Sequence, residues 1–337
     1  MRVILPPHEK PGRILCLLGM CVAFAGIGTG HLSKYFIYLD VFSHLTLHFA
    51  IAAITLGWAF LLPRYRLTTA ISLMLAGMVA LGAWGNYGPH SIPRGEVVPP
   101  GHRELRVMSF NIWLWNRDQV ANEAEIKRMD PDIVFMAEVV RPTRDMAGRM
   151  VARYPYQYPK DMGYGFLLWM MSRYPLQDVV VQSVWEGPVY LSASLGPEWG
   201  NLTILGTHTL RAPYVAAQWK QINALGKHVQ TIKSPRLVFG DFNATLYSRM
   251  VRQLAGQSGL IRRTSLPTWP VSWPGLPQLA IDHMFADREL LFPDGVITGQ
   301  YAGSDHLPIF ARVLVPVPGQ ASAESDTVKD VAHVIAN

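Results

Sequence analysis

The sequence predicts a layered α+β or α/β domain that follows a membrane region with about three transmembrane helices. Two observations carry this prediction. The first 84 residues contain three long apolar stretches, whereas the residues from about 103 onward alternate short β-rich runs with a few helical patterns. A segment rich in Pro and Gly lies between them. We therefore divide the chain into a membrane region (1–84), a linker (85–102), a folded domain (103–316) and a polar tail (317–337) that we expect to be disordered.

The three apolar stretches are candidate spanning helices. Residues 14–30 and 67–84 carry no charge, and residues 36–62 form a longer apolar stretch. A spanning helix needs about 20 mainly apolar residues, so the first and third are short but adequate and the second is ample.

The middle stretch contains three ionisable residues, Asp40, His44 and His48. They are four residues apart, so they share one face of a helix. Ionisable groups inside a span are candidates for a functional role such as ion or proton handling. Alternatively, they lie near the outer interface and face partner helices or water. The sequence leaves both readings open.

The orientation in the membrane follows from the positions of Lys and Arg. Basic residues precede the first stretch and fill the short loop at 63–66, whereas the loop between the first two stretches offers only Lys34. The positive-inside rule then predicts a multi-pass protein of the cell membrane with a cytoplasmic N-terminus. Everything after Trp84 is expected to be extracytoplasmic. A cleaved signal peptide is the alternative, but we find no convincing small-x-small cleavage site before His31, and further apolar stretches follow.

The charge is unevenly distributed along the chain. Residues 1–103 hold eight Lys and Arg against three Asp and Glu, which accounts for +5 of the net charge of +6. The folded domain is therefore nearly neutral, and the basic chain is no argument for nucleic-acid binding. Both cysteines, Cys16 and Cys21, lie in the first apolar stretch, so the domain has no disulfide framework.

The domain itself shows eight β-rich runs and three helical patterns. The helical patterns cover 119–129, 142–153 and 215–232. The β-rich runs are LRVMSFNIW, DIVFMAEV, YGFLLWMM, VYLSASL, NLTILGTHT, RLVFGDFNA, LAIDHMF and PIFARVLV.

Polar residues of the kind that bind metals and phosphate end several of these runs. They are Asn111, Glu138, His208, Asp241 with Asn243, and Asp282, and Asp305 and His306 follow at a turn before the last run. One such ending is unremarkable. Repeated endings with carboxylates, amides and imidazoles predict a site that is assembled at the tips of separate strands.

The motifs SFNI, AEV, SRYPL, THT, GDFNA, IDH and SDHLPI occur in this order between residues 103 and 316. In this order and spacing they resemble the endonuclease/exonuclease/phosphatase family, the DNase I-like metal-dependent phosphodiesterases. The resemblance implies two packed β-sheets flanked by helices, a four-layer α/β/β/α sandwich, and a catalytic domain at 103–316. Ala137 stands where the family commonly has Gln, which should weaken support of the neighbouring Glu138.

The resemblance also implies roles for the residues at the strand ends. Mg²⁺ or Mn²⁺ is expected as cofactor, with Glu138 as the first ligand, Asn111 beside it, and Asp305 binding or orienting a metal. Mg²⁺ keeps several waters, so one or two carboxylates suffice to hold it.

The remaining polar residues are expected to act on the substrate. Asp241 would orient or deprotonate the attacking water, and Asn243 would donate to the phosphate. His306 suits proton transfer or phosphate contact, because imidazole titrates near neutrality, and in the family the aspartate of IDH, here Asp282, pairs with it. His208 would contact the phosphate or help to protonate the leaving group. His283 alternates to the other face of its strand and is left out.

These expectations describe a membrane-anchored hydrolase of phosphoester bonds with an extracytoplasmic catalytic domain. Its substrate, nucleic acid or phospholipid, stays open, and no protein partner is evident. The alternative is a membrane-tethered binding or scaffold protein on an inactive hydrolase fold. The sequence leaves the role of two further groups open. Trp269 and Trp273 stack on a substrate, touch lipid or pack a loop. A phosphate-facing patch or a solvated surface is formed by Arg249, Arg252, Arg262 and Arg263.

Overall fold

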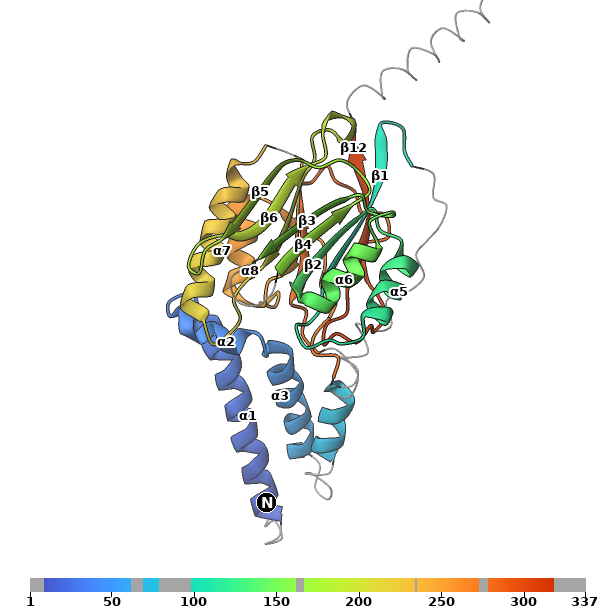
Figure 1. Ribbon diagram of the computed structural model, residues 1–337. Coiled ribbons are helices and arrows are strands. Elements are labelled where there is room, and N and C mark those ends of the chain that lie inside the picture. The colour runs from blue at the N-terminus through green and yellow to red at the C-terminus, as the bar shows by residue number, and fades with distance from the viewer. Residues whose placement is uncertain are drawn as a thin grey trace, which may run out of the picture.

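The computed structural model describes residues 9–61, 69–78, 98–161, 167–233, 235–272 and 278–317. Two six-stranded sheets pack face to face (Figure 1). The first sheet has the order β11 (Val296–Thr298), β12 (Ile309–Pro316), β1 (His102–Asn111), β2 (Ile133–Val139), β4 (Leu167–Ser172), β3 (Tyr156–Asp161). The second has the order β5 (Gln177–Ser183), β6 (Val189–Ser194), β7 (Thr203–His208), β8 (Arg236–Asp241), β10 (Asp282–Ala286), β9 (Ile261–Arg262).

The space between the sheets is filled by one face of each central strand. In β2, Ile133 and Phe135 point into this space, whereas Val134 points to the opposite face, as the two-residue period of a strand requires. The ring of Phe135 meets Phe239 of β8 edge to face, with centroids 5.9 Å apart. Gly206 of β7 lies directly under Phe135, where a Cβ would stand 2.2 Å from the ring. The sheets can therefore approach closely only because this position is glycine.

Helices cover the outer face of each sheet and complete four layers (Figure 1). α5 (Gln119–Met129) and α6 (Arg141–Arg149) pack on the first sheet, and α7 (Val215–Thr231) and α8 (Arg249–Ser258) pack on the second. A short 3₁₀ turn, η2 (Pro197–Trp199), follows β6. The expectation of two packed sheets flanked by helices is confirmed. α5 coincides with the helical pattern at 119–129, and α6 ends four residues before the pattern at 142–153 does.

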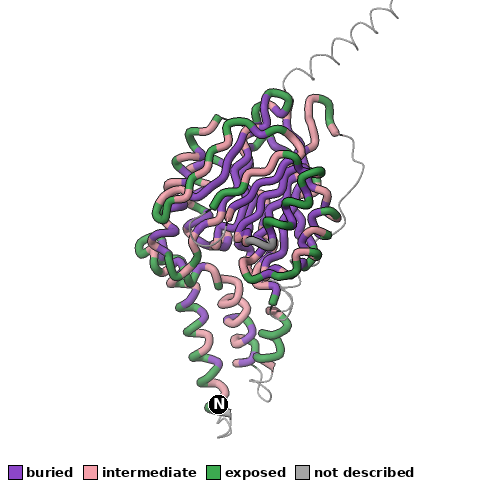
Figure 2. Tube along the Cα trace, in the orientation of Figure 1, coloured by how far each residue is buried: buried purple, intermediate pink, exposed green. Residues whose placement is uncertain are grey.

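The N-terminal helices project from one end of the sandwich (Figure 1). They are α1 (Glu9–Leu32), η1 (Ile37–Leu39), α2 (Asp40–Ser43), α3 (Thr46–Leu61) and a helix at Thr69–Met78. α1 packs along α3. Figure 2 shows that buried residues concentrate in the two sheets, while α1 and α3 carry mostly exposed and intermediate residues.

The prediction of about three spanning helices is corrected by this arrangement. Among the described residues, one helix, Pro11–Leu32, is long and apolar enough to cross a membrane. The middle stretch is bent by 56° between Ile37–Ser43 and Thr46–Leu61, so it counts as a second span only if both halves are taken together. The described part of the third stretch, Thr69–Met78, is too short. Asp40 and His44, which lie just before the start of α3, bind the sandwich, as described below.

The boundaries of the sandwich lie at β1 and β12. The amide of Val317 donates to the carbonyl of Gly101 (2.8 Å), which closes the two ends of the domain against each other. The predicted linker at 85–102 and the predicted tail at 317–337 fall almost entirely outside the described residues.

Candidate active site

The predicted site residues meet at the end of the sandwich where the N-terminal helices attach. β1 and β2 run parallel, as do β7 and β8, so Asn111, Glu138, His208 and Asp241 lie at the same end. β10 is antiparallel to β8, and its first residue, Asp282, pairs with Asp241. The strand directions therefore bring residues from both sheets to one place.

Two carboxylates form the centre of the site. Asn111 Nδ2 donates to Glu138 Oε1 (3.1 Å) and to Asp241 Oδ2 (3.0 Å), and so joins the two sheets. The amide of Leu114 donates to Glu138 Oε2 (3.0 Å). Asn111 Oδ1 accepts from the amide of Trp113 (2.9 Å), while Nδ2 is the atom that faces the two carboxylates.

Glu138 reaches the centre because β2 is irregular at this point. The register between β2 and β4 shifts between Met136 and Val139, and Glu138 has a positive φ of 56°. Such a bulge re-aims a side chain. The glutamate is thereby turned toward Asp241 instead of following the alternation of the strand.

His208 lies between the two carboxylates. Its Nε2 is 3.4 Å from Glu138 Oε1 and 3.5 Å from Asp241 Oδ2. Burial alone would lower the pKa of His208, but the hydrogen bonds to Asp241 and Glu138 raise it to about 10. Burial likewise opposes ionisation of Glu138, and the hydrogen bond from His208 nevertheless holds its pKa at about 2. In the absence of metal the three groups form an imidazolium between two carboxylates at neutral pH.

His306 stands on the other side of Asp241. Its Nδ1 is 2.9 Å from Asp282 Oδ2, and its Nε2 is 3.8 Å from Asp241 Oδ2. Burial lowers the pKa of His306, and the charges of Asp282 and Asp241 outweigh burial and raise it to about 9. Thr268 Oγ1 donates to Asp282 Oδ2 (2.5 Å), and Ser304 Oγ accepts from the amide of His306 (3.0 Å). The imidazole is thus fixed from several sides.

Asp305 offers an oxygen that has no partner. Its Oδ2 accepts from Trp269 Nε1 (2.9 Å), whereas the buried Oδ1 has no hydrogen-bond partner among the described residues. Oδ1 lies 3.9 Å from His306 Nε2. Burial raises the pKa of Asp305. A carboxylate held in this way is suited to bind a cation or a donor of the substrate.

Asn243 lies at the rim, next to Asp241. Its amide N–H donates to Asp241 Oδ1 (2.7 Å), and its side-chain Nδ2 donates to the carbonyl of Thr209 (2.9 Å). Its φ of 48° is left-handed, a conformation that Asn adopts more readily than most residues. All eight predicted residues are therefore connected in one cluster.

The cluster fits a divalent metal. Ligand atoms of Glu138, His208 and Asp241 lie within 4.8 Å of one another, and so do those of Asp241, Asp282 and His306. Carboxylate oxygens are the ligands that Mg²⁺ and Mn²⁺ prefer. Asp305 belongs to neither group and lies beyond His306.

Three residues that support the site had no clear signal in the sequence. Thr268 and Trp269 hold Asp282 and Asp305 from a Pro-rich loop, and Ser304 Oγ donates to the carbonyl of Asn111 (2.7 Å). Only Ser304 lies inside a recognised motif. The role of Trp269 as a donor to Asp305 adds to the packing considered from the sequence.

The other residues considered from the sequence lie apart from the cluster. Arg249, Arg252, Arg262 and Arg263 bind backbone carbonyls at separate places and form no common patch. His283 is buried on the opposite face of β10, with Nε2 2.7 Å from the carbonyl of Ala244. Trp273 lies outside the described residues.

Comparison with known proteins agrees with the geometry. Residues 108–306 match the model of the endonuclease/exonuclease/phosphatase family. An endonuclease/exonuclease/phosphatase from Beutenbergia cavernae has a similar structure, with 19% identity, a TM-score of 0.50 and coverage of 63% of this chain and 72% of that chain. TDP2 from D. rerio, complexed with a single-strand DNA product, has 15% identity, a TM-score of 0.52 and coverage of 62% and 98%.

At these identities the structural likeness shows the fold alone. No curated protein sequence matches the chain. The family model covers more than half of the 337 residues and includes the candidate site from Asn111 to His306. The chain therefore belongs to the endonuclease/exonuclease/phosphatase family and is a metal-dependent phosphoric ester hydrolase.

Proposed function

We propose that the protein is a membrane-anchored phosphodiesterase whose catalytic domain lies outside the cytoplasm and uses Mg²⁺ or Mn²⁺. One observation carries the catalytic part: Glu138 and Asp241 converge from two sheets and are flanked by His208 and His306. The complete set of acids, imidazoles and amides favours an enzyme over a binding protein on an inactive fold.

Glu138 would be the first ligand of the cation. When bound, a divalent cation neutralises charge on the phosphoryl oxygens and on the departing oxygen. Asp305, whose Oδ1 has no hydrogen-bond partner among the described residues, would bind or orient a metal near Nε2 of His306. Asn111 fixes the spacing between the two carboxylates through its amide group.

The other side chains would handle protons and the phosphate. A protonated His306 donates from Nδ1 to Asp282 and presents Nε2–H to the phosphoryl group or the leaving oxygen. His208 would donate to the phosphate or to the leaving oxygen. Asp241 would orient or deprotonate the attacking water, and Asn243 would turn its amide from Thr209 to the phosphate.

The membrane part of the proposal is supported by α1 and by the charge distribution. Large apolar side chains on α1, among them Leu18, Val22 and Phe24, are exposed in the isolated chain. Exposed apolar surface of this extent is typical of contact with lipid or another protein. The basic residues before α1 and in the loop at 63–66 favour a cytoplasmic N-terminus.

The substrate is a phosphoester of nucleic acid or phospholipid. The domain carries almost no net positive charge to favour duplex binding, and attachment to a bilayer would favour lipid or cell-surface phosphoesters. The fold itself accommodates single-stranded DNA in TDP2. Turnover of DNA, RNA, phospholipid and phosphomonoester by the same preparation decides between them.

The catalytic proposal is tested with the full chain in detergent and a small soluble phosphodiester, bis(p-nitrophenyl) phosphate. Turnover should require Mg²⁺ or Mn²⁺ and stop with EDTA. Glu138→Ala should lower kcat/KM at least about 100-fold, because a metal contributes several kcal/mol to the transition state. Asp145→Ala, an exposed change on α6, is the matched control. Turnover by Glu138→Ala at the wild-type rate would refute the assignment.

Topology is tested with reporters. A periplasm-active reporter fused after residue 316 should be active, and the protein should stay in the membrane fraction after alkaline extraction. Activity of a cytoplasm-only reporter at this position would overturn the extracytoplasmic location.

A further inference from the structure

The segment between α1 and α3, which contains the bend, is hydrogen-bonded to the catalytic domain. Asp40, in an otherwise apolar stretch, is fully buried. Its Oδ1 accepts from the backbone amide of Arg249 (2.7 Å), and its Oδ2 accepts from Ser248 Oγ. Burying a carboxylate is costly unless donors surround it. Ser43 Oγ, three residues along the chain, also donates to Oδ1 (3.1 Å), and the other two donors come from a segment that lies more than 200 residues away.

These contacts complete the start of α8. Ser248 is the N-cap residue, and its Oγ accepts from the amide of Met250 (3.0 Å). Asp40 accepts from the preceding amide of Arg249, so two segments together satisfy the first N–H groups of the helix. A negative charge at this position also interacts favourably with the helix dipole.

Arg249 binds back to the end of α1. Its Nη1 donates to the carbonyls of Ser33 (3.0 Å) and Lys34 (2.8 Å), and its guanidinium lies 4.4 Å from the ring centre of Trp219 in α7. Ile37 of η1 packs against the apolar cluster between α7, α8 and the second sheet. The bend and the outer helical layer therefore form one packed unit.

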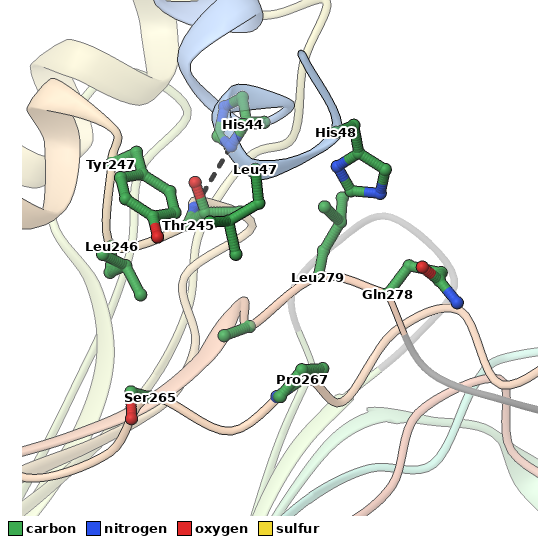
Figure 3. A pocket seen from close by; sticks show the side chains of 11 residues that line it. His44, Leu47, His48, Thr245, Leu246, Tyr247, Ser265, Pro267, Gln278 and Leu279 are labelled. Carbon is green, nitrogen blue, oxygen red and sulfur yellow. Dashed lines mark hydrogen bonds between the residues drawn. The ribbon is translucent and has the colours of Figure 1, made fainter. Parts of the chain in front are cut away.

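A third contact reaches the loop that carries a candidate catalytic residue. The amide of Thr245 donates to His44 Nδ1 (3.1 Å), as the dashed line in Figure 3 shows. Thr245 follows Asn243 by two residues, and Asn243 is bonded to Asp241. The segment from Asn243 to Ser248 is thus held by the active site at one end and by Asp40 and His44 along the rest.

Among the described residues, His44 is the only acceptor that the Thr245 amide has. A cavity of about 20 Å³, the room of one water molecule, is lined by His44, His48, Thr245 and Gln278 among others (Figure 3). Thr245 Oγ1 and both amide atoms of Gln278 have no hydrogen-bond partner within the described part of the chain. Loss of His44 would leave another polar group of this segment unpaired.

We infer that Asp40 and His44 are positioning residues for the hydrolytic reaction, acting through the segment from Asn243 to Ser248. They touch no candidate catalytic side chain directly. They set the backbone that places Asn243 and thereby Asp241, so the N-terminal helices are part of the active enzyme and more than a tether. The inference rests on the proposed site and adds residues outside the matched region of the family.

The test compares variants of the full chain in detergent on bis(p-nitrophenyl) phosphate, a substrate that needs no membrane. His44→Ala and Asp40→Ala should lower kcat about tenfold per folded molecule with little change in KM, because small misplacements of reacting groups cost this much or more. His44→Asn keeps an acceptor near the position of Nδ1 and should restore most of kcat. Asp145→Ala is again the control.

Amide hydrogen exchange provides a second readout. Exchange at Thr245 should be faster in His44→Ala and close to wild type in His44→Asn. If Asp40→Ala fails to fold, the His44 series still decides, since it removes a single contact.

Two failures are distinguishable. A wild-type chain without EDTA-sensitive turnover refutes the proposed function. Active wild type, inactive Glu138→Ala and an unchanged kcat in folded His44→Ala refute only the positioning role.

Discussion

Single residues in this structure reach the site through local departures from regular geometry. Glu138 turns inward at the β2 bulge, and Asn243 takes a left-handed conformation directly after β8. The sequence could predict that both residues belong to a site, because each follows an apolar strand. It could not predict Thr268, whose partner Asp282 lies 14 residues away across a loop without any periodic pattern.

His283 gives a prediction at this scale. Its imidazole is buried, Nε2 bonds the carbonyl of Ala244, and Nδ1 has no partner among the described residues, so burial lowers its pKa to about 4. The unfolded chain takes up the proton near pH 6.5, so stability is lost as the pH falls from 6.5 toward 4. This loss amounts to about 2 kcal/mol at pH 5.

His283→Gln keeps a donor toward Ala244 and removes the titrating group. Thermal unfolding of the metal-free full chain at pH 7.5 and pH 5 should show a larger drop in midpoint for the wild type than for the variant. Equal drops in both proteins would contradict the buried neutral imidazole.

Whole elements were easier to predict from the sequence than their ends and bends. The pattern at 119–129 predicts α5 because apolar residues recur at helical spacing, and the strands of the core read as apolar runs because they are buried on both faces. The middle apolar stretch reads as one long helix, and its bend was not predictable. The residue Asp40 before the bend accepts from the first amide of α8, and hydropathy contains no information on such a distant partner.

The contact between the sheets gives a prediction for Gly206. A Cβ at this position would press on Phe135, so Gly206→Ala should lower the free energy of unfolding by about 1–3 kcal/mol, the usual cost of overpacking. Phe135→Leu in the same chain should recover part of the loss, because the two sites share one space. Gly256→Ala is the control: this exposed position in α8 has open space around it, and alanine there should be neutral or stabilising. Denaturant unfolding measures all four chains, and equal losses at both glycines would count against the packing argument.

At the scale of the whole molecule, the sandwich and the N-terminal helices are not independent. Five hydrogen bonds join the bend to the segment Thr245–Arg249, and they lie at the same end as the site. The sequence predicts an apolar N-terminal region that precedes a layered domain. It did not show that the two meet, because the contacts are between residues that have ordinary local roles as caps and turns.

A fragment of residues 101–317 should therefore fold, but the start of α8 and the segment before it should be less stable than in the full chain. Without Asp40 and His44, the amides of Arg249 and Thr245 lose their acceptors, at about 1 kcal/mol or more each. Hydrogen exchange should accelerate in the first turn of α8 and stay unchanged in β1 and β12. Uniform protection in fragment and full chain would show that the helices add nothing to this region.

The buried carboxylate of Asp40 also has a consequence for the order of events during synthesis of the protein. The ribosome releases Asp40 long before Ser248, its partner 208 residues later. Until then Asp40 lies at the end of a pair of apolar helices and has no hydrogen-bond donors from the start of α8. Synthesis of the N-terminal helices and their attachment to α8 are therefore successive events, and Asp40 lacks the donors Ser248 and Arg249 until the last third of the chain is made.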